Sequence, residues 1–170
     1  MAEELIRDTE FSQPVIRGIV RLPLIAGKNA PGNLGSMINA IKKGCYFNIS
    51  GGKAARSVVL KDDIAPFLKA LSEHGGTYNF TDRHGLTYAS LYQEIQKNTS
   101  CPRRPDLPYW IAWCLALAGE CLHFVIRRPV PFDFYRLKKM TTSLTFDSTK
   151  AEKEIPFEPR PVIKNIKMIL

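Results

Sequence analysis

Apolar residues recur at helical spacing between short β-branched segments of the chain. One helical face is predicted from Leu34, Met37, Ile38 and Ile41. Val15–Val20 is apolar and β-branched at most positions, which predicts a buried strand. Thr77–Phe80 predicts a second strand. We expect both strands in one parallel sheet, because helical segments separate them along the chain.

Further elements alternate in the same way. Helices are predicted at Ala2–Thr9, Asp62–Gly75, Tyr88–Lys97, Tyr109–Ile126, Phe132–Met140, Asp147–Glu154 and Val162–Leu170. Short extended segments are predicted at Tyr46–Ile49, Ser57–Leu60 and Leu144–Phe146. Asp62 or Asp63 is expected to cap one helix and Thr87 another. The alternation predicts an α/β fold whose strands are too few for a complete sheet.

The segment Tyr109–Ile126 is apolar enough to require a comparison with membrane helices. It is slightly shorter than the about 20 residues that span a bilayer. Glu120 and His123 would be costly in hydrocarbon. We therefore expect a buried or surface-docked helix and not a membrane span; contact with a membrane face stays open.

The charge balance favours anionic partners. The formal net charge is +8, from 24 Lys and Arg against 16 Asp and Glu. A solvated positive surface explains the same excess, and no motif indicates nucleic-acid binding. The four cysteines form no Cys-x-x-Cys pair, so we expect no zinc site. Residues Met1–Arg7 do not resemble a secretory leader, so we expect a cytoplasmic protein.

Several short motifs occur in a distinctive order. They are Arg21–Gly27, Pro31–Leu34, Arg56–Ala65, Thr77–Asp82, Phe146–Ala151 and Phe157–Pro159. Together they resemble the second half of the extended short-chain dehydrogenase/reductase family, among its UDP-sugar epimerases and dehydratases. The epimerases of UDP-N-acetylhexosamines in polysaccharide biosynthesis are the most similar. The resemblance implies an incomplete extended short-chain dehydrogenase/reductase fold, with residues 1–170 as a single C-terminal substrate-binding domain.

The resemblance also implies that the NAD-binding segment and the catalytic pair of the family lie outside this chain. Family members begin with a glycine-rich strand–turn–helix that holds NAD, and the chain contains no G-x-x-G-x-x-G. Their catalytic Tyr-x-x-x-Lys pair is expected upstream, because Met1–Leu5 matches the helix that follows its lysine. We therefore expect the N-terminal Rossmann half to be absent, NAD to bind only in the intact enzyme and this chain alone to be inactive.

Two motifs provide candidate ligands for the pyrophosphate of a UDP-sugar. Arg56 matches the family arginine that touches it, and a guanidinium can form two hydrogen bonds with a phosphate. A surface arginine paired with Asp62 or Glu73 is the alternative. Asn33 and the adjacent Leu34 match the start of a family helix, where free N–H groups can hold a phosphate. A simple N-cap is the alternative for Asn33.

The remaining candidate site residues follow from the same resemblance. Tyr46–Ser50 matches the strand that flanks uracil, so Phe47 and Asn48 are included, with a core aromatic as the alternative for Phe47. Arg136 lies where the family often has a second pyrophosphate arginine; an exposed helix arginine is the alternative. Asp63 is predicted to be a structural cap.

The resulting hypothesis is the UDP-sugar-binding portion of an NAD-dependent 4-epimerase. A nucleotide-sugar dehydratase stays open, because the residues that separate the two reactions lie upstream. A non-enzymatic interaction or regulatory module derived from an epimerase is the other alternative. The unpaired edge of Val15–Val20 predicts a homodimer, since exposed strand edges favour association.

Overall fold

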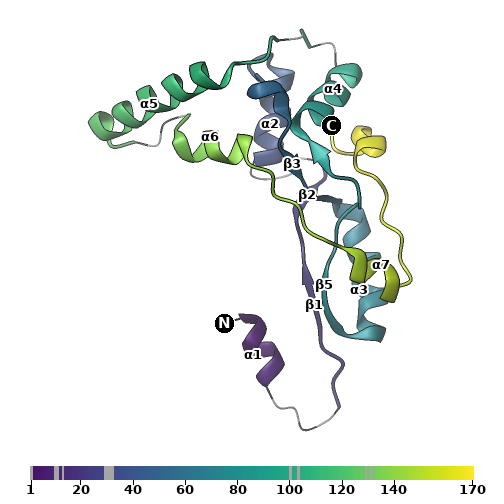
Figure 1. Ribbon diagram of the computed structural model, residues 1–170. Coiled ribbons are helices and arrows are strands. Elements are labelled where there is room, and N and C mark those ends of the chain that lie inside the picture. Colours follow the sequence, from purple (N-terminus) through teal and green to yellow (C-terminus); the bar gives the residue numbers. More distant parts are fainter. Residues whose placement is uncertain are drawn as a thin grey trace. The chain divides into compact units, whose positions relative to one another are not determined.

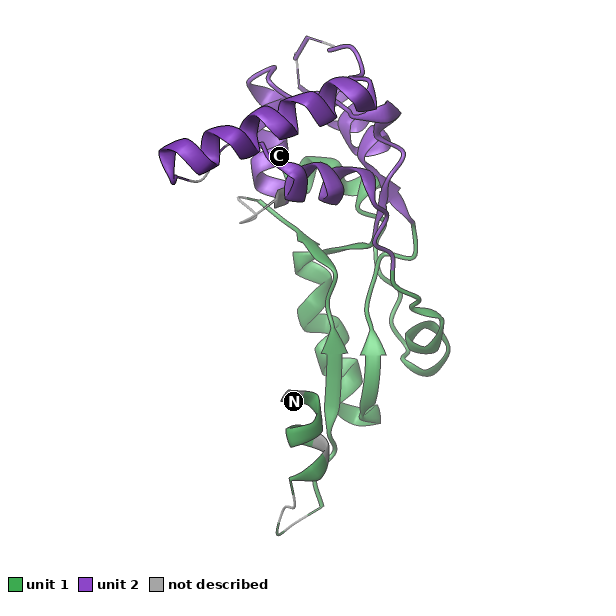
Figure 2. Cartoon of the chain, turned by 60° about the vertical axis from the view of Figure 1, so that its left-hand side comes forward, with its two compact units in different colours: residues 1–30, 57–84, 146–169 green, residues 31–56, 85–145, 170 purple. Residues whose placement is uncertain are grey.

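The chain forms two compact units, each built from segments that are far apart in the sequence (Figures 1 and 2). The computed structural model describes residues 2–9, 12, 14–28, 33–99, 101–102, 104–128, 130 and 132–170; the side chains of Ala2, Arg7 and Asn33 lie outside this description. Unit 1 comprises Met1–Ala30, Ser57–His84 and Phe146–Ile169. Unit 2 comprises Pro31–Arg56, Gly85–Thr145 and Leu170.

Unit 1 contains two pairs of parallel strands. β1 (Gly18–Arg21) pairs with β5 (Gly76–Asn79), which confirms the predicted parallel partners. β2 (Leu24–Ala26) pairs with β4 (Val58–Leu60), and β2 was not predicted. The predicted burial of Val15–Val20 is wrong. Val15, Ile16 and Gly18 are exposed, and Ile19 and Val20 are half-buried, because the strand begins only at Gly18, opposite Gly76 of β5.

Helices and an aromatic cluster complete unit 1. The helices are α1 (Ala2–Asp8), α3 (Lys61–His74), α7 (Thr149–Glu154) and the 3-10 helix η2 (Ile163–Met168). Phe67 of α3 stacks on Phe80 with ring centroids 3.8 Å apart, and Phe157 meets both rings edge-on. α3 ends at Gly75, whose φ of 66° favours glycine.

Asp63 does not cap α3. The residue before the helix is Leu60, and Asp63 lies within the first turn with its side chain buried. Its carboxylate accepts hydrogen bonds from the backbone N–H and the Nε–H of Arg160, at 2.8 and 2.7 Å. The aspartate therefore has a structural role, as predicted, but it joins α3 to a segment 97 residues further along the chain.

Unit 2 consists mainly of helices. They are α2 (Asn33–Lys42), α4 (Tyr88–Asn98), α5 (Tyr109–Ile126), α6 (Phe134–Thr141) and the short 3-10 turn η1 (Ser50–Gly52). β3 (Ala55–Arg56) pairs antiparallel with β6 (Leu86–Thr87). Thr87 caps α4, as predicted, in a reciprocal arrangement with Ser90.

One prediction for unit 2 is wrong. Tyr46–Ile49 is extended but forms no strand, because its sheet-like pairing is limited to one parallel bridge between Ile49 and Leu107. Of the two alternatives for α5, the surface-docked one holds: α5 packs against α6, and Ala112 and Ala116 are its only buried residues. These small side chains allow close packing on one face of α5 and leave its large apolar side chains exposed.

Candidate functional site

Arg56 is held by two different parts of unit 2. Its Nε–H donates to the Tyr88 hydroxyl at 3.1 Å, and an Nη group donates to the Lys139 carbonyl on α6. Its guanidinium also lies 5.7 Å from the centre of the Tyr88 ring. Neither Asp62 nor Glu73 is among these contacts. Because a guanidinium has five N–H donors, these two bonds leave three to hold an anion.

A small apolar cavity lies on the other side of this connection. Its volume is about 200 Å³. It is lined by Cys45, Tyr46, Phe47, Ile49, Leu107, Leu115, Phe132 and Met140. Met140 directly follows Lys139, whose carbonyl binds Arg56, and α6 also contacts η1. Arg56 and the cavity beside the predicted base-binding segment thus contact consecutive residues of α6, Lys139 and Met140.

Phe47 lies at the edge of the cavity with 39% of its surface exposed, so its ring can meet a ligand. The neighbouring backbone is partly occupied: Leu107 N–H donates to the Asn48 carbonyl, and Ser50 N–H donates to the Leu107 carbonyl. Both bonds join this segment to the chain just before α5. They fix the segment in an extended form without a sheet.

Two buried polar atoms of this segment lack partners, and of their residues Tyr46 lines the cavity whereas Asn48 has its Oδ1 atom beside Gly52. The Tyr46 hydroxyl and the Asn48 Oδ1 atom form no hydrogen bond within the described residues. Burial, followed by the charges of Tyr88 and Tyr92, raises the pKa of Tyr46 well above its usual value, so its hydroxyl stays protonated. Buried polar groups are normally paired, so unpaired ones indicate a strained site or an absent ligand.

Arg136 lies on α6 and is exposed, as the helix alternative requires. It is four residues before Met140, and residues at this spacing lie on one face of a helix. Arg136 is therefore on the face of α6 that borders the cavity. The Lys139 ammonium lies over the Tyr135 ring, so Arg56 and Arg136 are the cationic candidates for a ligand with two adjacent phosphates.

One pair of residues in α6 has the spacing of the catalytic pair of the family. The spacing Tyr-x-x-x-Lys does occur in the chain, at Tyr135 and Lys139 of α6. The Lys139 ammonium lies 4.1 Å from the centre of the Tyr135 ring, over its face. This is a cation–π contact on an exposed tyrosine, and it provides no reason to assign the pair a proton-transfer role.

The start of α2 contributes differently from the prediction. The side chain of Asn33 lies outside the described residues. Leu34 is 2% exposed and belongs to the core, so its side chain cannot reach a ligand. α2 packs against α4, the helix that begins with the Arg56 partner Tyr88. Only the backbone N–H groups at the start of α2 remain as candidates for phosphate binding.

Tyr88 and most of the cavity lining were not predicted from the sequence. Tyr88 positions Arg56, while the unpredicted lining residues are Cys45, Leu107, Leu115, Phe132 and Met140. The residues beside them in the sequence gave no indication of a site, because each of them reaches the site by packing against a distant segment. Tyr88 follows the predicted cap Thr87, and this was the one local indication that its position was fixed.

The glycine pairs of the described residues do not match a cradle for the NAD pyrophosphate. Such a cradle places several glycines between a strand and the start of a helix. Gly51 and Gly52 precede β3, Gly75 follows α3, and Gly76 begins β5, whereas Gly27 is a single described glycine between β2 and α2. No step that involves NAD can be assigned to these residues.

Comparisons with known proteins place this geometry in a known fold. No family model and no curated protein sequence matches the chain. A nucleoside-diphosphate-sugar epimerase from Pseudomonas aeruginosa is similar over 99% of this chain, with 21% identity and a TM-score of 0.67. UDP-glucose 4-epimerase from Thermotoga maritima, solved with UDP-glucose, also matches over 99%, with 16% identity and a TM-score of 0.64.

The chain has the nucleotide-sugar epimerase fold. A third structure, UDP-glucose 4-epimerase from Bifidobacterium longum with NAD+ and UDP, matches over 99% with 14% identity and a TM-score of 0.52. The chain spans about half the length of these proteins, namely 49%, 48% and 49%. The predicted α/β class and the incomplete extended short-chain dehydrogenase/reductase fold are therefore confirmed.

Proposed function

We propose that this chain is the C-terminal, UDP-sugar-binding portion of an NAD-dependent 4-epimerase. The observation that supports the proposal most strongly is the joint placement of Arg56 and the cavity by α6. Arg56 is fixed by Tyr88 and by the Lys139 carbonyl, and it keeps further N–H donors. A fixed guanidinium beside an apolar cavity suits a ligand with a flat ring and a phosphate group.

Different parts of the ligand bind at the cavity and at the arginines. The cavity of about 200 Å³ is smaller than the roughly 300–1,000 Å³ typical of complete small-molecule sites, so it suits one part of the ligand. Its apolar lining and the exposed ring of Phe47 suit the base, and the Tyr46 hydroxyl gains a hydrogen-bond partner. The pyrophosphate binds Arg56 and Arg136, and the sugar extends beyond the cavity.

The rest of the reaction belongs to the intact enzyme. NAD and the proton-transferring residues are supplied by the half of the epimerase fold that this chain does not span. We propose a UDP-N-acetylhexosamine as the sugar substrate and a cytoplasmic role in polysaccharide biosynthesis. A dehydratase would use the same nucleotide-binding portion, so UDP binding is common to both reactions.

A calorimetric titration of the chain with UDP tests the nucleotide site. We expect UDP to bind more tightly than uridine, because Arg56 and Arg136 contact only the phosphates. ADP should bind more weakly than UDP, because a purine is larger than the base the cavity accommodates. The Arg56→Gln variant should bind UDP at least about tenfold more weakly, as expected for the loss of charge-assisted hydrogen bonds.

A matched arginine provides the control. Arg83 in unit 1 is also partly buried, and it pairs with Glu152 and Glu158 at 3.5 and 3.7 Å. Arg83→Gln should leave UDP affinity unchanged. Equal losses in the two variants would indicate a nonspecific effect of charge, and unchanged binding in Arg56→Gln would contradict the proposed site.

A further inference from the structure

α5 exposes large apolar side chains around most of its circumference. Trp110, Leu117 and Phe124 are seven residues apart and form one stripe, and they are 68%, 42% and 84% exposed. Leu115 and Leu122 form another stripe, at 51% and 47%. At about 100° per residue, these stripes lie on clearly different sides of the helix. The packed face, at Ala112 and Ala116, is the narrow remainder.

This distribution determines the kind of partner that can cover α5. A helix docked on another protein normally presents one apolar stripe and a polar opposite face, whereas a helix that is apolar all round is buried or lies in a membrane. The mean hydropathy of α5 is 1.5, and only 11% of it is buried within the chain. A protein surface would cover one stripe and leave the other in water. Lipid can cover both.

The charges near α5 favour an anionic lipid surface. Arg127 and Arg128 follow the helix directly and are exposed. α6 packs against α5 and adds Arg136, Lys138 and Lys139. Basic residues near an anionic membrane contribute about 1 kcal/mol each to binding. The formal net charge of +8 acts in the same direction.

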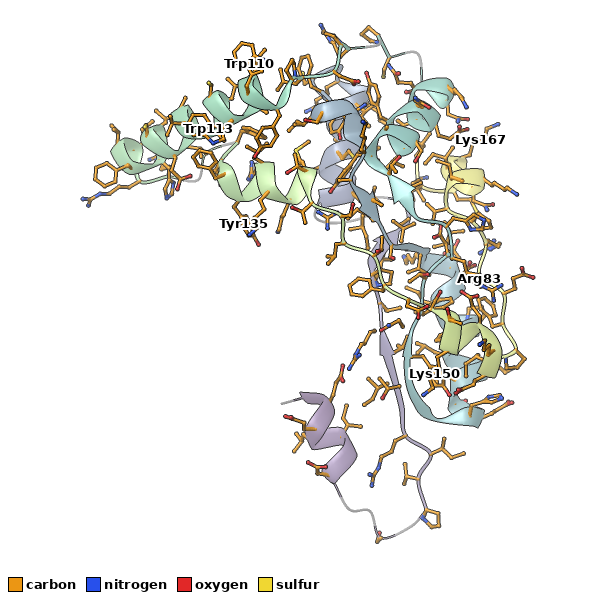
Figure 3. All side chains as sticks on the ribbon, in the orientation of Figure 1. Arg83, Trp110, Trp113, Tyr135, Lys150 and Lys167 are labelled. Atoms are coloured by element: carbon orange, nitrogen blue, oxygen red, sulfur yellow. The ribbon has the colours of Figure 1, made fainter. Side chains whose placement is uncertain are left out.

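Aromatic residues mark the level of the headgroups. Trp and Tyr are enriched where the hydrocarbon meets the polar headgroups. α5 begins with Tyr109 and Trp110 and carries Trp113 one turn later; Figure 3 shows both tryptophans on α5 and Tyr135 on α6. Aromatic residues at one end and arginines at the other suit a helix with both ends at the headgroups.

α6 excludes a complete crossing of the bilayer by α5. Trp113 and Phe134 are 5.7 Å apart between ring centroids. Further along, a Cβ atom at Gly119 would lie 1.9 Å from the Phe132 carbonyl oxygen, so the chain just before α6 lies directly against α5. A crossing α5 would draw the cations of α6 into hydrocarbon, which is costly. α5 must therefore lie along the surface.

We propose that α5 docks the protein on an anionic lipid bilayer, with the helix in the plane of the interface. Its two apolar stripes enter the acyl boundary, while the arginines after α5 and the cations of α6 contact lipid phosphates. The proposal shares Leu115 of α5 and Arg136 of α6 with the proposed nucleotide site, and vesicle binding in the absence of UDP tests it separately.

The tryptophans allow a direct test, because both tryptophans of the chain lie in α5. The full chain is mixed with phosphatidylcholine–phosphatidylserine vesicles or with pure phosphatidylcholine vesicles, and bound protein is measured by flotation. We expect binding to the anionic vesicles, a blue shift of tryptophan emission and quenching by lipids with brominated acyl chains. Pure phosphatidylcholine should bind at least about tenfold less protein.

Matched variants separate the two contributions. Phe124→Gln with Val125→Gln replaces side chains that are 84% and 77% exposed, so the fold is retained, and vesicle affinity should fall at least tenfold. Val15→Gln with Ile16→Gln in unit 1 is the apolar control and should bind normally. Arg128→Gln with Lys138→Gln should weaken binding to anionic vesicles, whereas Lys164→Gln with Lys167→Gln should not.

Three results would overturn the proposal. One is the absence of flotation with anionic vesicles. Another is vesicle binding without quenching by brominated lipids, since this would place α5 outside the bilayer. The third is a concentration-dependent blue shift without lipid that prevents vesicle binding, because a second copy of the chain would then cover α5.

Discussion

Replacing Asp63 with alanine removes the acceptor that joins α3 to the segment before η2. The carboxylate is 2% exposed and accepts from the backbone N–H and the Nε–H of Arg160. A second guanidinium nitrogen of Arg160 lies 2.5 Å from the same carboxylate. The Asp63→Ala variant therefore loses all of these contacts and leaves a partly buried backbone N–H without its partner.

The expected loss of stability depends on whether each N–H donor of Arg160 can bind water once the Asp63 carboxylate is removed. A partly buried N–H without a partner costs about 1–3 kcal/mol. The guanidinium loses a charged hydrogen bond of similar size, but its side chain is 47% exposed and can be hydrated again, so most of this contribution is recovered. We expect a total loss of about 2–3 kcal/mol in the free energy of unfolding of unit 1.

Amide hydrogen exchange measures this loss where it occurs. The N–H groups of Phe80 and Asp82 donate to the carbonyls of Arg21 and Val58 within unit 1, so their exchange reports the opening of this unit. Asp62→Ala is the control, because Asp62 is exposed and contributes at most about 1 kcal/mol as a charge near the start of α3. Equal protection in the two variants would refute the reasoning.

Three further predictions follow from single features. Tyr46→Phe removes a buried hydroxyl without a partner, so it should raise the stability of the free chain by about 1 kcal/mol in urea denaturation and weaken UDP binding; lower stability would contradict this. Hydrogen bonds from Thr149 lower the pKa of Asp147, so the ionised carboxylate stabilises the chain at pH values above its unfolded pKa. In thermal melts, the stability difference from Asp147→Asn should disappear as the pH falls through the lowered pKa. A constant difference at all pH values would argue against this cause. The open edge of β1 predicts a homodimer in light scattering. Val20→Pro should disrupt it, because Arg17 and Arg21 face β5 and the backbone of Val20 therefore faces the open edge; a monomer at high concentration would refute the prediction.

Local signals in the sequence predicted the elements that depend on neighbouring residues. The capping of α4 by Thr87 needs only Ser90, three residues later, and the parallel pairing of β1 with β5 follows from two β-branched segments around a helix. β2 was missed because only three residues separate Pro23 from Gly27, which is too few to show a pattern. The fixed order of several short motifs was enough to predict the fold class, because that order does not depend on the exact bounds of the helices and strands.

Features that depend on distant partners could not be predicted. Asp63 was assigned to a cap because its partner Arg160 is remote in the sequence. The strand predicted at Tyr46–Ile49 depends on Leu107, which supplies only one bridge. The exposure of α5 could not be predicted either, because a core helix and a helix that faces outward can have the same apolar composition. Each case requires knowledge of what packs against the segment.

The most direct test of the nucleotide site is an NMR titration of the chain with UDP, in which the Arg56 side-chain Nε–H and the Phe47 and Met140 amides are followed together. These groups belong to the guanidinium, the cavity edge and the helix that connects them. We predict that all three signals shift with one common dissociation constant. Unchanged signals at Arg56 and Phe47, with shifts confined to unit 1, would contradict the account.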